Sequence, residues 1–247
     1  MQISHETFAQ EELAAHAARA REEGVPTVSC AVLKGSAPDQ LARAATEDES
    51  DLIVVGAHRN SSFAQDLLGT TAGKLLRSSD RPVLVARGED ASRYSSVVVA
   101  IDFSPASRRA LRIALEWFST AQISVISAYG KARRMPRAND EFAGEARRLA
   151  LQGLLSEVGA EMGPSGTAAA EAEAIAVYGW PEDAIEDFIA VRKPGLVVVG
   201  THGRSGIEQA AFGSVAEWVT STATCDVLAV PPPLSPSLVD GPLLTRS

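Results

Sequence analysis

The sequence predicts an α/β protein built around a doubly wound parallel sheet, and three observations support this fold class. Short apolar runs without polar alternation, such as residues 97–101 and 196–199, are typical of parallel strands covered on both faces. From residue 97 onward these runs alternate with helical patterns, as in a sheet with helices on both sides. The chain also repeats part of itself, which indicates two units of one kind.

The repeat defines the expected domain organisation. Shifting the chain by 144 positions places residues 52–87 over residues 196–231 without a gap, with 11 identities in 36 positions. A period this long indicates two similar domains, because the repeats of solenoids are shorter. We therefore expect domains at residues 1–88 and 95–231, a polar linker between them, and a mobile, proline-rich tail at residues 232–247.

The first half is expected to alternate α-β-α-β-α-β. Its helices have apolar residues at helical spacing, its strands are β-rich or continuously apolar, and Gly24 ends the first helix. The expected elements, in order, are residues 6–23, 25–33, 36–47, 52–55, 70–77 and 82–85.

The second half is expected to alternate β-α-β-α-β-α-β-α-β, which gives a five-stranded sheet. Ser104 is in position to cap the first helix, and Pro105 suits its first turn. A loop rich in small residues is expected at residues 163–170. The expected elements, in order, are residues 97–101, 105–118, 123–129, 141–158, 172–178, 181–191, 196–199, 213–219 and 227–230.

Composition limits the class of protein. The formal net charge of −8 argues against a general nucleic-acid binder, which needs an excess of Lys and Arg. No run approaches 18 apolar residues and the start lacks the regions of a signal peptide, so we expect a cytoplasmic protein without membrane partners. Cys30 and Cys225 lie in or beside apolar runs and are expected to be buried thiols.

Catalytic and metal-binding patterns are missing from the sequence. The four histidines have no metal-ligand spacing, and no Ser, His and acid set is indicated, so no catalytic residue and no metal site are expected. A P-loop lysine is also missing, which argues against efficient phosphoryl transfer, although slow ATP hydrolysis or autophosphorylation stays open.

One segment of the second half has the features of an anion site. The frame Gly-x2-Gly-x9-Gly-Ser is formed by Gly200, Gly203, Gly213 and Ser214. A glycine at the end of a strand lets the backbone turn with its N–H groups outward, and Gly213-Ser214 puts unpaired N–H groups at the positive end of a helix. The alternative is a tight turn followed by an ordinary Ser-capped helix.

Asp102 follows the first strand of the second half. If that strand and the strand before Gly200 are neighbours, Asp102 can accept hydrogen bonds from a nucleoside while the glycine frame holds its phosphates. The alternative is a helix-capping or surface carboxylate. His202 either contacts a phosphate or, as is more usual for a loop histidine at a turn, is exposed. A basic cluster falls on the same side and either is solvated or helps to attract ATP; it comprises Lys131, Arg133, Arg134 and Arg137.

The first copy of the motif is altered. Arg59 stands where the second copy has Gly203, and Thr70 replaces Ser214. An arginine side chain at that turn occupies the space through which a phosphate would approach the backbone, so no nucleotide is expected in the first half.

The segments VVVAIDFSPAS and GTHGRSGIEQAAFGS, within this alternating pattern, resemble the universal stress protein family in its tandem form. The resemblance implies a Rossmann-like, adenine nucleotide alpha hydrolase-like fold and a stress-associated cytoplasmic protein that binds ATP, with or without magnesium. It further implies that Asp102 contacts the adenosine and that the backbone of Ala128 contacts adenine. Phe103 stands where glycine is frequent and is expected to narrow the adenine entrance. The ribose and phosphates would be surrounded by Gly200, Gly203, Arg204, Gly213, Ser214 and Val215.

By the same resemblance, the first half lacks the first strand, first helix and second strand of the family's domain. Those strands would lie between the third and fourth, so three outcomes are open: the remaining strands close up, a partner chain fills the gap, or the true start lies upstream. The strands at residues 82–85 and 227–230 lack strong charge and suit pairing between the halves.

Three functions follow from the residues and the resemblance. The favoured one is a regulatory protein, not an enzyme, whose conformation or choice of regulatory protein partner depends on ATP. The alternatives are a slow ATPase or autokinase, and a nucleotide-free scaffold that acts as a homodimer.

Overall fold

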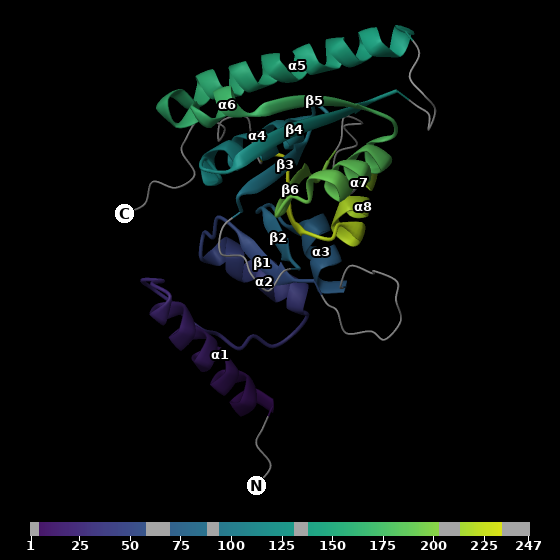
Figure 1. Cartoon of the computed structure of the whole chain (residues 1–247). Coiled ribbons are helices and arrows are strands. Elements are labelled where there is room, and N and C mark those ends of the chain that lie inside the picture. Colours follow the sequence, from purple (N-terminus) through teal and green to yellow (C-terminus); the bar gives the residue numbers. More distant parts are fainter. Residues whose placement is uncertain (1–4, 58–69, 88–93, 131–137, 203–212, 234–247) are drawn as a thin grey trace.

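The computed structural model describes residues 5–57, 70–87, 94–130, 138–202 and 213–233. Its centre is a seven-stranded sheet with the order β1-β2-β7-β6-β3-β4-β5 (Figure 1). The strands are β1 (Ile53–Gly56), β2 (Val83–Ala86), β3 (Ser96–Ala100), β4 (Gln122–Tyr129), β5 (Glu173–Tyr178), β6 (Leu196–Gly200) and β7 (Asp226–Val230).

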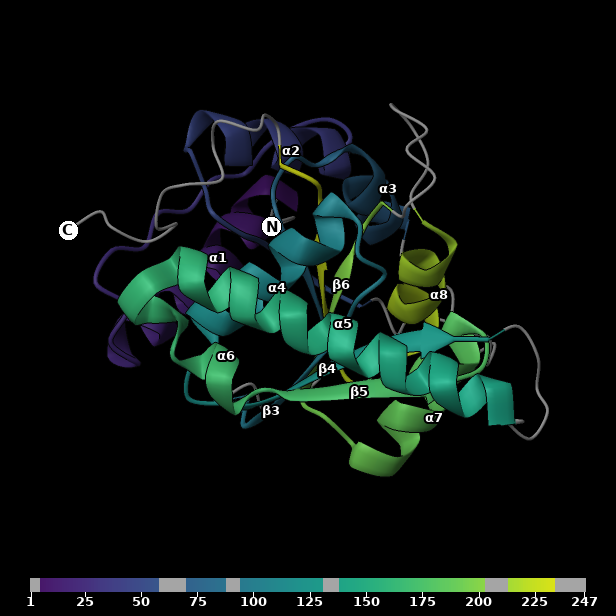
Figure 2. The ribbon, with the colours of Figure 1, turned by 90° about the horizontal axis from the view of Figure 1, so that it is seen from above.

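Helices cover both faces of the sheet, as the doubly wound pattern predicts. Figure 2 shows the long helix α5 lying along the strands of the second half. The helices are α1 (His5–Glu22), α2 (Ala37–Glu47), α3 (Thr70–Ser78), α4 (Pro105–Trp117), α5 (Ala138–Met162), α6 (Ala168–Glu171), α7 (Pro181–Arg192) and α8 (Ser214–Thr222), with a 3-10 turn, η1, at Gly163–Gly166. None of the described helices is long and apolar enough to cross a membrane.

The two halves share one sheet because β2 and β7 pair antiparallel, with Val83 opposite Ala229 and Val85 opposite Val227. This confirms the expected pairing between the halves. The five strands of the second half are parallel to one another, as predicted. The observed sheet is larger than the predicted five strands, since β1 and β2 extend it beyond β7.

Two apolar clusters lie on opposite faces of this sheet. Alternate residues of β3 show the division, because Val97 and Val99 belong to the cluster beneath α4 and α5, whereas Val98 belongs to the other. The second cluster contains residues of α3 and α8, such as Leu75 and Val219, both fully buried. The helix that follows each copy of the glycine motif therefore packs into one common core.

The retained elements of the first half match their counterparts closely. α3 and α8 each contain nine residues, and Thr70 and Ser214, which begin them, are related by the shift of 144 positions found in the sequence. β1 pairs directly and parallel with β2. This is the same neighbour relation as that of β6 and β7, so the remaining strands do not close up across the gap, and within the described chain β1 is an edge of the sheet.

The strand predicted at residues 25–33 is wrong, because this segment forms neither helix nor strand. In the second half the third strand, β5, is separated from the fourth, β6, by β4 and β3. The first half has no described strand equivalent to β4, which is the neighbour of β5 in the second half. Val25 and Leu33 are consequently exposed, and α1 lies apart from the sheet in Figure 1.

Two further expectations need correction. The predicted loop at residues 163–170 contains η1 and most of α6, and α5 is longer than the predicted residues 141–158. Cys30 is exposed rather than buried, because it belongs to the unpaired segment just described, whereas Cys225 is half-buried. The domain limits stay predictions; residues 88–93 of the linker and 234–247 of the tail lie outside the described residues.

Candidate functional site

β3 and β6 are neighbours in the sheet, with Ala100 opposite Val199. From β3 the chain proceeds outward through β4 and β5, then returns to place β6 on the other side of β3. This reversal is a topological switch point, where open α/β sheets form a crevice beyond the carboxyl ends of their strands. Asp102 and Gly200 both lie at this edge. The two strands that lead to them are therefore neighbours, as the candidate nucleotide site requires.

A cavity of about 450 Å³ opens at the switch point. Its size is within the range of ligand pockets, and much of its lining is apolar. Six of the eight predicted site residues line it: Asp102, Ala128, Gly200, Gly213, Ser214 and Val215. The other two, Gly203 and Arg204, lie outside the described residues, as do Arg59 and the predicted basic cluster.

The amino end of α8 faces this cavity without a capping side chain. Gly213 is the N-cap residue, and its own N–H donates to the carbonyl of Thr201 at 2.7 Å. Thr201 is held in turn, because its N–H donates to the carbonyl of Val230 at 2.8 Å. Since the first N–H groups of a helix have no partner within it, the first turn of α8 can donate to an anion.

Asp102, which also lines the cavity, is held by a local turn after β3. The N–H of Ser104 donates to Oδ1 of Asp102 at 3.0 Å, and Oγ of Ser104 accepts from the N–H of Ser107 at 3.2 Å. Ser104 is therefore the cap of α4, as predicted, and Asp102 is not. Oγ of Ser104 also donates to the carbonyl of His202 at 3.1 Å, which ties the start of α4 to the segment after β6.

The structural reason for Gly200 differs from the one predicted. Its φ does not lie in the left-handed region, so a sharp turn does not require glycine there. A Cβ at Gly200 would lie 2.7 Å from the nitrogen of Ser107 and 2.8 Å from the carbonyl carbon of Ala106. Gly200 is therefore needed because the backbone of α4 lies directly against it. Gly56, its counterpart in the first half, has no described atom within 4 Å of such a Cβ.

A model of the universal stress protein family matches residues 1–87 and 93–231. The chain belongs to this family.

Curated members of this family are similar to the chain in sequence, and a solved structure is similar to it in fold. The chain is 29% identical over 192 residues to a universal stress protein of Mycolicibacterium smegmatis, covering 74% of this chain and 62% of the relative. It is 26% identical over 200 residues to one from Mycobacterium tuberculosis, covering 73% and 62%. A universal stress protein structure from Archaeoglobus fulgidus shares the fold, with a TM-score of 0.69 and 21% identity over 93% of this chain and 83% of that one. The chain thus spans about 62% of the length of these two curated relatives.

Phe103 of this universal stress protein adopts a left-handed backbone conformation, with φ of 65°. This conformation is unfavourable for a bulky side chain and explains why glycine suits the position. The ring does not narrow the cavity as predicted, since Phe103 is not among the described lining residues. It packs instead against the apolar cluster beneath α4 and α5.

The sequence reading missed Arg147, which lines the cavity from α5. Its guanidinium carbon lies 5.3 Å from the centroid of the Phe103 ring. The residue is one of many charged residues on a long helix, so no local pattern distinguished it from its neighbours. Two buried serines were also missed: Ser107 lines the cavity, and Ser127 does too while its hydroxyl donates to the carbonyl of Ile101 at 2.6 Å.

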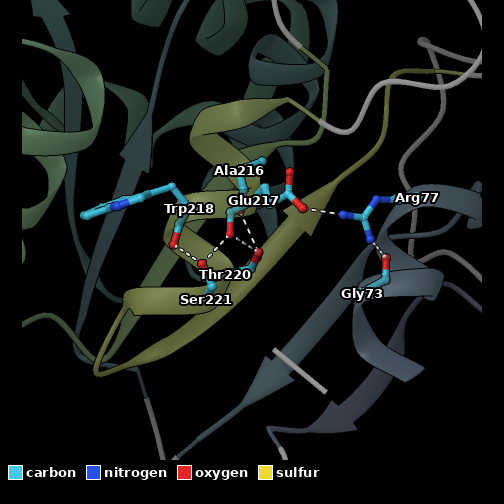
Figure 3. A network of polar contacts seen from close by, with 7 residues as sticks. All are labelled: Gly73, Arg77, Ala216, Glu217, Trp218, Thr220 and Ser221. Atoms are coloured by element: carbon cyan, nitrogen blue, oxygen red, sulfur yellow. Dashed lines mark hydrogen bonds and ion pairs between the residues drawn. The ribbon is translucent and has the colours of Figure 1, made fainter. Parts of the chain in front are cut away.

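The first half of the chain contacts the site helix directly. Figure 3 shows Arg77 of α3 reaching across to Glu217, which lies in the first turn of α8, while also donating to the carbonyl of Gly73. Side chains farther along α8 bond back onto their own helix, as when Oγ1 of Thr220 donates to the carbonyl of Ala216 at 2.7 Å. The helix that faces the cavity is thus tied by an ion pair to its counterpart in the altered copy.

A second link between the halves lies at the start of β7. The buried carboxylate of Asp226 accepts from the N–H of Arg87 at 2.7 Å and from the hydroxyl of Tyr94 at 2.5 Å. Burial and, secondarily, this hydrogen bond raise the pKa of Tyr94 well above its ordinary value. Burial likewise raises the pKa of the Cys225 thiol to about 11. Both groups are therefore neutral at ordinary pH.

Proposed function

We propose that the second half of this universal stress protein binds an adenine nucleotide, with ATP as the expected ligand, and that the nucleotide regulates the protein's conformation or its choice of partner. The observation that carries the proposal is one cavity in which an uncapped helix end and a carboxylate face an apolar lining. These groups complement the three parts of a nucleotide: phosphates, sugar hydroxyls and base.

The amino end of α8 suits the phosphates. The N–H groups in its first turn, beginning at Ser214, are free of intrahelical partners, and the helix dipole places partial positive charge there. Gly200 and Gly213, which have no side chains, line the cavity together with Ser214. The residues present therefore fit a phosphate group.

The other end of the cavity suits a nucleoside. Asp102 keeps one carboxylate oxygen engaged in its turn, and the second can accept from a sugar hydroxyl. Apolar side chains of β4, β5 and α7 provide a surface for a flat base; they include Ile126, Val177 and Ile185. Ala128, on β4, also lines the cavity, and the proposal assigns to its backbone the contact with adenine.

We expect magnesium to enter the cavity bound to the phosphates of the nucleotide. Among the described residues there is no group of three or more His, Cys, Asp or Glu side chains placed to hold a metal ion. Mg²⁺ is commonly held by substrate phosphates with few protein ligands, so a magnesium-ATP complex is compatible with this cavity.

The proposal is tested by thermal unfolding and by mass. The protein is purified without denaturation, and small molecules that accompany it are identified by mass spectrometry. ATP at about 100 times its dissociation constant should raise the free energy of unfolding by about 2.7 kcal/mol, which corresponds to roughly 5–10 °C in Tm for a chain of this size.

Variants connect any stabilisation to the site. Gly203→Arg copies Arg59 of the first half and should abolish the stabilisation by ATP. Gly153→Arg is the matched control, because Gly153 lies on the exposed side of α5 and a Cβ there meets no described atom within 4 Å. Stabilisation that persists in Gly203→Arg would contradict the proposed site.

The same measurements separate the two alternative functions. Lack of stabilisation by ATP, ADP and AMP would favour the nucleotide-free scaffold. Such a scaffold would need a surface other than the β7 edge for a homodimer, because β2 of the same chain already pairs with that edge. ATP turnover above background that is lost in Asp102→Ala would favour the slow ATPase or autokinase.

A further inference from the structure

Two charged side chains are found among the described residues that line the cavity: Asp102 at the end of β3 and Arg147 of α5. They have opposite charge, yet no ion pair joins them. Asp102 is engaged by the N–H of Ser104. Arg147 is therefore the cation that the described part of the cavity offers to a ligand.

Arg147 differs from other arginines of α4 and α5 in its partners. Arg148, its neighbour, pairs with Glu145 at 2.6 Å, and Arg112 of α4 pairs with Glu161 at 2.7 Å. Arg147 makes no ion pair with any described residue, and the contact found for it is the face of the Phe103 ring, 5.3 Å away.

The cation is partly buried and faced by an aromatic ring rather than by an anion. Contact with a ring face stabilises a guanidinium less than a charged, hydrogen-bonded partner does. Partial burial also removes some of the water that would otherwise solvate the charge. Such an arrangement is completed by an anion that enters the cavity.

We propose that Arg147 binds a phosphate oxygen of the nucleotide and makes the cavity select nucleotides over nucleosides. This inference rests on the proposed function, which supplies the class of ligand. A guanidinium presents a planar fork of donors that matches two oxygens of a phosphate, whereas a nucleobase is neutral and offers it no charge.

The negative charge of Asp102 makes a compensating cation necessary. A phosphate that enters a cavity containing a carboxylate experiences like-charge repulsion, which strengthens where water is partly excluded. Arg147 offsets this repulsion from the α5 side while the first turn of α8 donates from another wall. The ligand's phosphate would thus be held between a helix end and a side-chain cation.

Phe103 acts in this arrangement as a positioning residue. Its backbone is held at a φ of 65°, which is uncommon for a bulky residue and costs conformational energy. The consequence of this conformation is that the ring packs against the core and lies beneath the guanidinium. The ring restricts the conformations of the Arg147 side chain and so reduces the conformational entropy that is lost when a ligand binds.

The test is a titration of adenosine, AMP, ADP and ATP by calorimetry against the full chain and three variants. Arg147→Gln removes the positive charge. Arg147→Lys keeps the charge but loses the planar set of guanidinium donors, and Arg148→Gln is the control on the adjacent residue. In Arg147→Gln, affinity for AMP, ADP and ATP should fall by roughly tenfold to a hundredfold, the range of a charge-assisted hydrogen bond, with adenosine changed less than about twofold. Arg147→Lys should recover part of the loss, and Arg148→Gln should bind as the unmodified chain does.

Each other outcome is informative. An equal loss for adenosine would mean that Arg147 contacts the base or sugar, which overturns the inference while leaving the proposed function intact. Unchanged affinity for every ligand in Arg147→Gln would also overturn it. If the unmodified chain binds none of the four, the proposed function itself has failed. The Tm of Arg147→Gln without ligand, expected to match that of Arg148→Gln within about 2 °C, guards against a folding defect.

Discussion

The two glycines that end β6 and β1 provide a matched test of how the site is built. Gly200→Ala and Gly56→Ala make the same chemical change at equivalent positions of the repeat. At Gly200 the new methyl group would lie 2.7 Å from the nitrogen of Ser107 and 2.8 Å from the carbonyl carbon of Ala106. At Gly56 it would meet no described atom within 4 Å.

The expected free energies follow from these contacts. The atoms that crowd Gly200 belong mainly to the backbone of α4, so the conflict is not relieved by rotation of a side chain. Overpacking of this kind lowers the free energy of unfolding by about 1–3 kcal/mol. At Gly56, whose φ is not in the left-handed region, alanine reduces the entropy of the unfolded chain and should be neutral or stabilising by up to about 1 kcal/mol.

Thermal unfolding monitored by circular dichroism measures the difference. Gly200→Ala should lower Tm by roughly 2–12 °C, at about 2–4 °C per kcal/mol for a chain of this size, while Gly56→Ala leaves it unchanged or slightly higher. Equal effects of the two substitutions would refute the reasoning, because they would show that contact with α4 does not determine the need for glycine at Gly200.

Three further outcomes are expected. The raised pKa of Tyr94 favours its neutral form in the folded protein, so stability should be fully present below pH 10 and fall as pH rises above it. In Tyr94→Phe, the free energy of unfolding measured by urea titration should fall less steeply above pH 10. An unchanged dependence on pH would contradict the assigned role of Tyr94. Exposed Cys30 should react with a thiol reagent at pH 8 well before Cys225, whose pKa is about 11; equal rates would argue against this burial. Arg77 and Glu217 are each about half exposed, so a double-mutant cycle should give a coupling of about 0.2–1 kcal/mol, and a value above about 2 kcal/mol would be inconsistent with a surface pair.

Much of the fold was predictable because its central strands are continuous apolar runs that alternate with helical patterns. Ser104 caps α4, and the shift of 144 positions correctly relates the starts of α3 and α8. The pairing of the last strands of the two halves was predictable as well, since neither strand carries the charge that usually protects an exposed edge.

The errors come from features that depend on neighbours distant in sequence. Residues 25–33 have the composition of a strand, but a strand forms only beside a partner, and none is described next to them. The exposure of Cys30 follows from the same error. The need for glycine at residue 200 was explained wrongly, because contact with α4 cannot be read from the local sequence.

The site was predicted in part. Asp102 and the start of α8 could be placed together because the carboxyl ends of neighbouring parallel strands meet at one edge. The place of Arg147 at the cavity could not be predicted, because its position above Phe103 depends on how α5 crosses the sheet.

The antiparallel contact between β2 and β7 has a consequence for folding during synthesis. Val83 cannot meet Ala229 until β7 has been translated, which at about 5–20 residues per second means a delay of roughly 7–30 s after β2 is translated. Until then β1 and β2 form an isolated two-stranded pair, which is too small to be stable alone. We therefore expect β1 and β2, although translated before β7, to acquire protection from hydrogen exchange only after β7 has been made, and to be a site at which chaperones bind the nascent chain.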